Sequence, residues 1–139
     1  HYPTIDFRSR DNDGNNLLNH VARNGNSKML KKVIDRMKEK NIEIDCRNNR
    51  GFTALLLAIQ NDKFLNAYYL VKLGECSTSI KDDEKRMNAI EWLLHRIEIN
   101  KDIILNENNT SNNNQTNSDG FINSLKSKLK LLFIILIEY

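Results

Sequence analysis

The sequence predicts an all-α protein, an α-solenoid of stacked helix–turn–helix repeats joined by short loops. A similar phrase of five residues occurs three times, at residues 14–18, 51–55 and 86–90. The third residue of each phrase is Asn16, Thr53 or Asn88, whose side-chain oxygen can accept the free N–H groups of a first helical turn. Thr53 follows Asn16 by 37 residues and Asn88 follows Thr53 by 35, a period that indicates stacked repeats.

The second unit shows the pattern most fully. A helix is predicted over residues 54–59, which are apolar on nearly every side and therefore suit a helix buried between neighbours. Residues 61–62, Asn-Asp, supply a turn, and apolar residues between 64 and 71 recur at helical spacing. Gly74 follows, where a left-handed helix end is expected.

The first unit repeats this order. A helix from Leu17 to Ala22 is followed by Asn-Gly at 24–25, a strong turn signal. The next helix has its apolar residues between 29 and 37 on one face. Its other face is basic and consists of Lys28, Lys31, Lys32, Arg36, Lys38 and Lys40. We interpret the basic side as a solvated outer face, with binding to a partner or a membrane as the alternative.

A third unit begins at Asn88 and is interrupted. Residues 106–120 contain seven Asn and no apolar residue, a composition that predicts disorder. Four Leu residues follow at helical spacing, from Leu125 to Leu136. We therefore predict that 122–139 is the displaced second helix of this unit and that about 98–120 is an insertion.

A membrane segment is the alternative for the C-terminal stretch. Its longest run without charge, residues 131–137, has seven residues, whereas a spanning helix needs about twenty. Direct membrane insertion is therefore not expected. Because this apolar run ends without a polar cap, we expect further repeats in the native protein or self-association through the C-terminal helix.

The composition argues against several classes of function. Lys and Arg number 21 against 18 Asp and Glu, with both signs interspersed, which does not suit a nucleic-acid binder. Cys46 and Cys76 match neither a metal spacing nor a redox motif and suit a reducing, cytoplasmic compartment. No glycine cluster or hydrolase motif occurs, and His20 and His95 lie in different units. We expect no enzyme activity, cofactor or metal, and the start without Met suggests a fragment.

Residues 53–58, Thr-Ala-Leu-Leu-Leu-Ala, resemble the ankyrin repeat signature Thr-Pro-Leu-His-x-Ala at Thr, Leu and Ala. The first unit keeps Leu18, and the third has Arg86 where the family has glycine, which would strain a left-handed turn. The resemblance divides the chain into ankyrin-like repeats at about 10–44, 45–79 and 80–139. Since the family period is about 33 residues, the first spacing implies about four extra residues, most simply a longer second helix near 35–40.

The resemblance implies a non-enzymatic interaction module that binds a protein partner through finger loops and a concave groove. Carried over position by position, the partner-binding residues of the first unit are Asn12, Asp13, Asn15, Arg23 and Asn24. Those of the second unit are Asn49, Arg50, Phe52, Gln60 and Asn61. Those of the third are Met87, His95 and Arg96, beside Glu84 and Lys85. The alternative is an intracellular ankyrin tether or spacer within a larger membrane or cytoskeletal protein.

The fingers also suggest the chemistry of a partner. Basic residues of the second finger stand between acidic residues of the first and third. This alternation of charge either stabilises the stack itself or steers a partner, and as a partner site it favours a small acidic motif over nucleic acid. Phe52 is expected either to anchor a partner as an exposed aromatic residue or to fold back onto the next finger. His20 and Trp92 occupy the place of Leu57 in their units, and we predict that both pack between stacked helices, with contact to a partner as the alternative.

Overall fold

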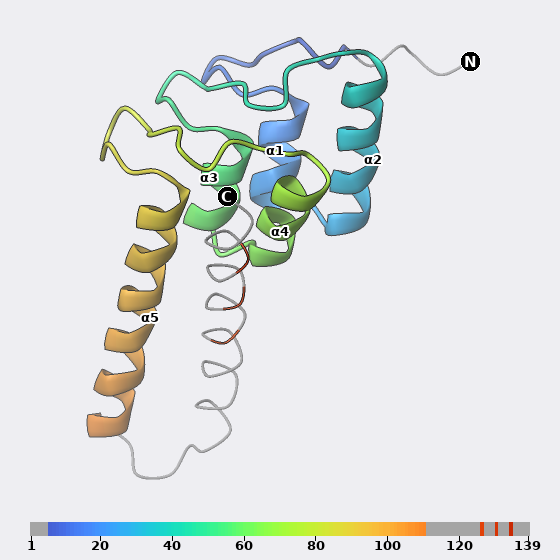
Figure 1. The fold of residues 1–139 in the computed structure, drawn as a ribbon. Coiled ribbons are helices and arrows are strands. Elements are labelled where there is room, and N and C mark those ends of the chain that lie inside the picture. The colour runs from blue at the N-terminus through green and yellow to red at the C-terminus, as the bar shows by residue number, and fades with distance from the viewer. Residues whose placement is uncertain (1–5, 111–125, 127–129, 131–133, 135–139) are drawn as a thin grey trace.

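The computed structural model of the chain describes residues 6–110 and, beyond them, residues 126, 130 and 134. Its helices are α1 (Leu17–Asn24), α2 (Ser27–Glu39), α3 (Ala54–Gln60), α4 (Phe64–Lys72) and α5 (Ala89–Thr110). Helices α1, α3 and α5 pack in sequence as an inner layer, and α2 and α4 pack against one another outside them (Figure 1). The described part of the chain contains no strand, and the predicted solenoid of helix–turn–helix repeats is confirmed.

The three inner helices begin at the predicted capping residues. Asn16 accepts from the backbone N–H of Asn19 at 2.9 Å, and the Asn19 side chain accepts from the N–H of Asn16 in return. Thr53 accepts from the N–H of Leu56 at 3.3 Å. Asn88 and Glu91 repeat the reciprocal arrangement at the start of α5. Each cap satisfies N–H groups that have no acceptor within the helix.

The outer helices differ in length as the spacing predicts. Helix α2 has 13 residues and α4 has 9, which accounts for the longer first unit. The expectation of a left-handed Gly74 is wrong, because Glu75 takes that conformation with φ 53°. Gly74 is instead in a close approach, where an added Cβ would stand 2.6 Å from the carbonyl oxygen of Leu70.

Helix α5 is longer than the sequence suggests and extends well past α3 and α4 (Figure 1). It continues through Thr110, so residues 98–110 are helical and the predicted disorder is wrong for residues up to 110. The placement of an insertion at about 98–120 stays a prediction. No glycine or proline between residues 75 and 119 gives the helix a reason to stop. Residues 111–120 and most of the predicted helix 122–139 lie outside the described residues, although Lys126, Lys130 and Ile134 are helical.

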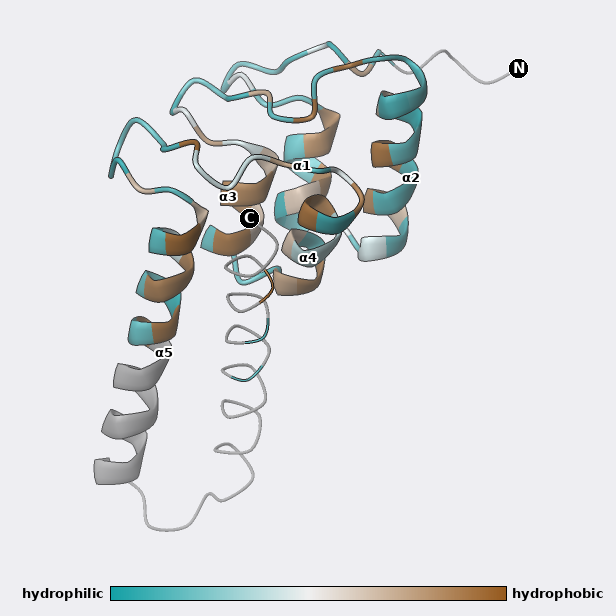
Figure 2. Cartoon of the chain, viewed as in Figure 1, coloured by the Kyte–Doolittle hydropathy of each residue, from teal (hydrophilic) through white to brown (hydrophobic). Residues whose placement is uncertain are grey.

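The core lies between the two layers. Figure 2 shows α3 as predominantly hydrophobic, and all its residues except Gln60 are buried. Asn66 on α4 is also buried and joins the first two units. Its Nδ2 donates to the carbonyl oxygens of Ala22 at 3.2 Å and Gly25 at 3.0 Å, and its Oδ1 accepts from Ser27. A polar side chain in the core thus fixes how the second unit sits on the first.

The loops that precede the inner helices form three fingers, which we define as residues 11–15, 48–52 and 82–87. Each begins with a side chain that accepts N–H groups of its own loop. These pairings are Asp11 with Asp13 and Asn15, Asn48 with Arg50 and Phe52, and Asp82 with Glu84, Lys85 and Met87. Backbone hydrogen bonds from Asn49 to Asp13 and from Asp83 to Arg50 join neighbouring fingers.

Each finger also contains one left-handed residue. Gly14 has φ 80°, Gly51 has φ 82°, and Arg86 has φ 57° in the third finger. Glycine adopts this conformation without a steric penalty, whereas Arg86 carries a Cβ that opposes it. Arg86 therefore takes the left-handed conformation for which the sequence predicts strain.

Candidate protein-binding groove

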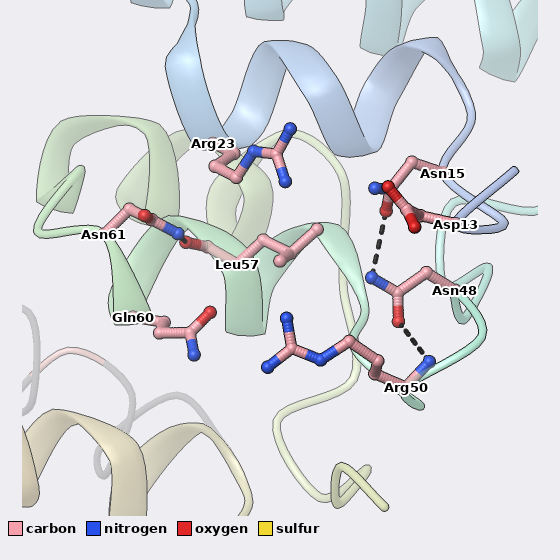
Figure 3. Close-up of a pocket in the computed structure, with 8 residues that line it drawn as sticks. All are labelled: Asp13, Asn15, Arg23, Asn48, Arg50, Leu57, Gln60 and Asn61. Carbon is pink, nitrogen blue, oxygen red and sulfur yellow. Dashed lines mark hydrogen bonds between the residues drawn. The ribbon is translucent and has the colours of Figure 1, made fainter. Parts of the chain in front are cut away.

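A groove of about 400 Å³ lies beside α1 and α3, between their C-terminal ends and the first two fingers (Figure 3). We call it the α1–α3 groove. Its lining residues are Asp13, Asn15, Arg23, Asn48, Arg50, Leu57, Gln60 and Asn61. All but Asn48 and Leu57 are among the residues that the sequence analysis assigned to partner binding, and the fold brings them together.

Helix α3 supplies one wall of the groove and its one apolar lining side chain. Leu57 stands at the position held by Trp92 in the third unit and is 3% exposed. Gln60 ends the helix, and Asn61 donates from Nδ2 to the carbonyl oxygen of Leu57 at 2.8 Å. Helix α3 is only seven residues long. The side-chain amides of Gln60 and Asn61 at its C-terminal end therefore lie close to the fingers near its N-terminal end.

A pair of asparagines builds the finger side of the groove. Asn48 donates from Nδ2 to the Oδ1 of Asn15 at 2.9 Å, and its own Oδ1 accepts from Arg50 and Phe52 (Figure 3). Asn15 is 4% exposed. Asn48 is not among the residues predicted from the sequence, although its place three residues before Gly51 matches that of Asp11 before Gly14.

Two guanidinium groups reach the groove, and their surroundings differ. Arg50, from the second finger, donates through Nε and Nη2 to both carboxylate oxygens of Glu84, the Nη2 bond being 2.6 Å. This pairing raises the pKa of Arg50 and lowers that of Glu84. Arg23 lies in the last turn of α1 and is half-buried. In the described part of the chain its one side-chain polar contact is with His20, at 3.4 Å.

His20 lies between Arg23 and the first finger. The Nδ1 of His20 lies 3.4 Å from the Nη2 of Arg23, and its Nε2 lies 2.6 Å from the Oδ2 of Asp11. The pKa of Asp11 is lowered, first by the backbone N–H of Asn15 and then by His20. The prediction that His20 packs between helices is wrong, since its side chain is 40% exposed. Trp92, in contrast, is buried as predicted.

Phe52 is the clearest correction among the predicted partner-binding residues. Its side chain is 0% exposed, so the expectation of an exposed aromatic anchor is wrong. The ring packs against Trp92 with centroids 5.8 Å apart. Phe52 lies two residues before the buried helix α3, and the finger turns its ring into the interface with the third unit.

The other predicted residues lie outside the α1–α3 groove. Arg96 makes a bidentate ion pair with Asp62 at 2.8 and 2.7 Å, which holds α5 to the turn between α3 and α4. His95 packs edge-on against Trp92, and Met87 packs partly buried against the core. Asn49 donates to the backbone carbonyl of Asn12 at 3.0 Å. The remaining predicted residue is Asn24, which is exposed at the end of α1.

The described residues contain no cluster of three or more His, Cys, Asp or Glu side chains that could hold a metal ion. No helix among them has the length and apolar character to cross a membrane. Cys76 is buried, and burial raises the pKa of its thiol well above the usual value, which keeps it in the unreactive thiol form.

Comparison with known proteins agrees with the repeat geometry. A family model described as ankyrin repeats in three copies matches residues 3–82. The chain is also similar to the IkB-like protein of African swine fever virus, isolate Tick/South Africa/Pretoriuskop Pr4/1996, with 31% identity over 88 residues. That alignment covers 63% of this chain and 37% of the viral protein, so the chain spans little more than a third of its relative. Ankyrin repeats are protein–protein interaction modules, and this chain belongs to the ankyrin repeat family.

Proposed function

We propose that this chain binds a protein partner in the α1–α3 groove and recognises an acidic side chain there. The observation that carries the proposal is that the guanidinium of Arg23 is open to a further acceptor. That guanidinium lines the groove, and its one polar contact among the described residues is with the Nδ1 of His20 at 3.4 Å. A guanidinium has five N–H donors in a planar fork that matches a carboxylate, so a partner carboxylate would satisfy donors that the protein leaves open.

The amides around Arg23 supply the rest of a recognition surface. Asn15 places its amide group in the groove, where the hydrogen bond from Asn48 to its Oδ1 holds it. The side chain of Gln60 makes no hydrogen bond to any described residue and lines the same groove. A peptide carbonyl or carboxylate placed between these amides would gain hydrogen bonds in a partly desolvated site, where they are worth more than on open surface.

The groove favours a peptide over a nucleic acid. Its cations are balanced locally, because Asp13 lines it and Glu84 neutralises Arg50. Nucleic-acid binding needs several unneutralised Lys or Arg residues that displace counterions from phosphates. One open guanidinium with amides beside an apolar Leu57 suits a single carboxylate flanked by an apolar side chain.

A titration with synthetic peptides tests this function. The probe is a fluorescent peptide of about ten residues, roughly 33 Å when extended, with one central Glu flanked by Leu and Ala. Its matched control has Gln in place of Glu. We expect fluorescence anisotropy to report tighter binding of the Glu peptide, and Arg23→Gln to weaken that binding about tenfold or more, since a charge-assisted hydrogen bond contributes about 1.5–3 kcal/mol.

Arg36→Gln is the matched control variant, because it removes an equal charge from the exposed side of α2, away from the groove. It should bind the Glu peptide as the wild type does. Equal binding of the Glu and Gln peptides by wild-type protein would contradict the proposal, as would an equal loss in both variants. The alternative role as a tether or spacer in a larger protein stays a prediction and would leave both peptides unbound.

A further inference from the structure

Arg50 and Glu84 form a contact that occupies the second guanidinium of the α1–α3 groove. The two residues belong to different fingers, and both carboxylate oxygens of Glu84 are engaged by the side chain of Arg50. Arg50 lines the groove beside Asn48 and Leu57, whereas Glu84 is not among the lining residues (Figure 3). The groove thus has one open guanidinium, at Arg23, and one already bound to a carboxylate of the same chain.

The Arg50–Glu84 pair is placed where a competing carboxylate could replace it. The side chains of Arg50 and Glu84 are 54% and 45% exposed, so water and solutes reach both partners. Exposed ion pairs contribute little net free energy because charges at the surface stay well solvated when they separate. Exchange of Glu84 for another carboxylate therefore requires neither unfolding of a finger nor a buried unpaired charge.

We infer that Glu84 is an internal competitor for a second acidic side chain of the partner, so that the groove takes a segment with two acidic residues. The first acidic side chain binds the open Arg23, and the second displaces Glu84 from Arg50. This inference rests on the proposed function, since it names the partner chemistry of the same groove. It makes the contact between the second and third fingers part of partner selection.

The third finger contains a matched ion pair that does not reach the groove. Asp83, next to Glu84, accepts from Arg47 at 2.8 Å, and neither residue lines the groove. Asp83→Asn and Glu84→Gln remove the same charge from adjacent positions. Any long-range effect of net charge on an acidic peptide is therefore shared by both variants, and only the release of Arg50 is specific to Glu84→Gln.

The experiment compares two peptide probes on three proteins by fluorescence anisotropy. One probe has a single central Glu, and the other has two Glu residues three or four positions apart, in chains of about ten residues. We expect Glu84→Gln to bind the two-Glu probe about two- to fivefold more tightly than the wild type, the range that an exposed ion pair of up to about 1 kcal/mol allows. Asp83→Asn should bind it as the wild type does.

Two further measurements separate this inference from the function on which it rests. The single-Glu probe should gain less than the two-Glu probe from Glu84→Gln, because Arg23 is open in both proteins and already binds its one carboxylate. Arg50→Gln should remove the advantage of the two-Glu probe over the single-Glu probe. An equal gain in affinity for the two-Glu probe in Glu84→Gln and Asp83→Asn, or no gain in either, would overturn the role of Glu84. The proposed function would still stand if binding of the single-Glu probe depends on Arg23. Loss of all Glu-dependent binding would overturn both.

Discussion

Trp92 donates a hydrogen bond of 2.9 Å from its Nε1 to the Oδ1 of Asp82, which joins the inner helix of the third unit to the start of its own finger. Both residues are buried. Asp82 also accepts from the backbone N–H groups of Glu84 at 3.0 Å, Lys85 at 2.7 Å and Met87 at 3.1 Å. One carboxylate therefore shapes the third finger and fixes its position on α5.

Replacing Asp82 with Asn should destabilise the protein by about 2–4 kcal/mol, because an amide cannot accept all four hydrogen bonds and lacks the charge that strengthens them. Urea unfolding followed by circular dichroism measures this change. Asp83→Asn is the matched control, since the Asp83 side chain is 62% exposed and its loss should change stability by less than about 1 kcal/mol. Equal midpoints for the two variants would contradict the structural role of Asp82.

The contribution of Asp82 should depend on pH in a defined direction. Burial raises its pKa, but the hydrogen bonds from Lys85, Trp92 and Met87 together outweigh burial and lower it. A carboxylate with a lowered folded pKa contributes stability that is complete above the unfolded pKa of about 3.9 and is lost as pH falls through the folded value.

The stability difference between wild type and Asp82→Asn should therefore be largest near about pH 6 and shrink as the pH falls below about 3.9. Urea midpoints of both proteins across this range measure the difference. A gap that stays constant down to the lowest pH would show that the charge of Asp82 makes no contribution.

Asn66→Ala should cost about 2–3 kcal/mol of stability, because the carbonyl groups of Ala22 and Gly25 would lose a buried donor. Thermal unfolding measures the loss. Asn24→Ala is the control, since Asn24 is exposed one residue before Gly25 and makes no side-chain hydrogen bond to a described residue. A midpoint for Asn66→Ala as high as that of Asn24→Ala would show that the two units hold together without this amide.

Arg86→Gly should stabilise the protein by about 0.5–1 kcal/mol, because glycine takes φ 57° without the penalty of a Cβ. The opposite change at the equivalent place, Gly51→Ala, should destabilise it by more than about 1 kcal/mol. There an added Cβ would also stand 2.7 Å from the backbone nitrogen of Asp83. Chemical unfolding of both variants tests the pair, and a loss of stability in Arg86→Gly would refute the strain.

Much of the fold could be predicted because its signals are local. The capping residues Asn16, Thr53 and Asn88 act on N–H groups within three residues of themselves, so their period of about one repeat marks the inner helices. The end of α5 could not be predicted in this way. Its Asn-rich continuation has low apolar content, yet the helix runs to Thr110, and composition alone did not show where it ends.

The candidate groove was predicted in part. The resemblance to ankyrin repeats assigned Arg23, Arg50 and Gln60 to partner binding, and Arg23 and Gln60 hold equivalent positions in adjacent units. It did not reveal that Arg50 is bound to Glu84 while Arg23 is open, because nothing in the sequence distinguishes the two arginines. That difference depends on side-chain contacts between fingers 34 residues apart.

The sequence by itself determined the repeat architecture, through helix caps, turn dipeptides and apolar periodicity, which are interactions between near neighbours in the chain. Only the tertiary structure decided which polar residues line the candidate groove and which hold the stack. Phe52, Arg96 and Asn49 lie at positions that look exposed in the sequence, but stacking turns each toward the adjacent unit. The physical reason is that burial and ion pairing are set by distances between units, which the order of residues in one unit does not contain.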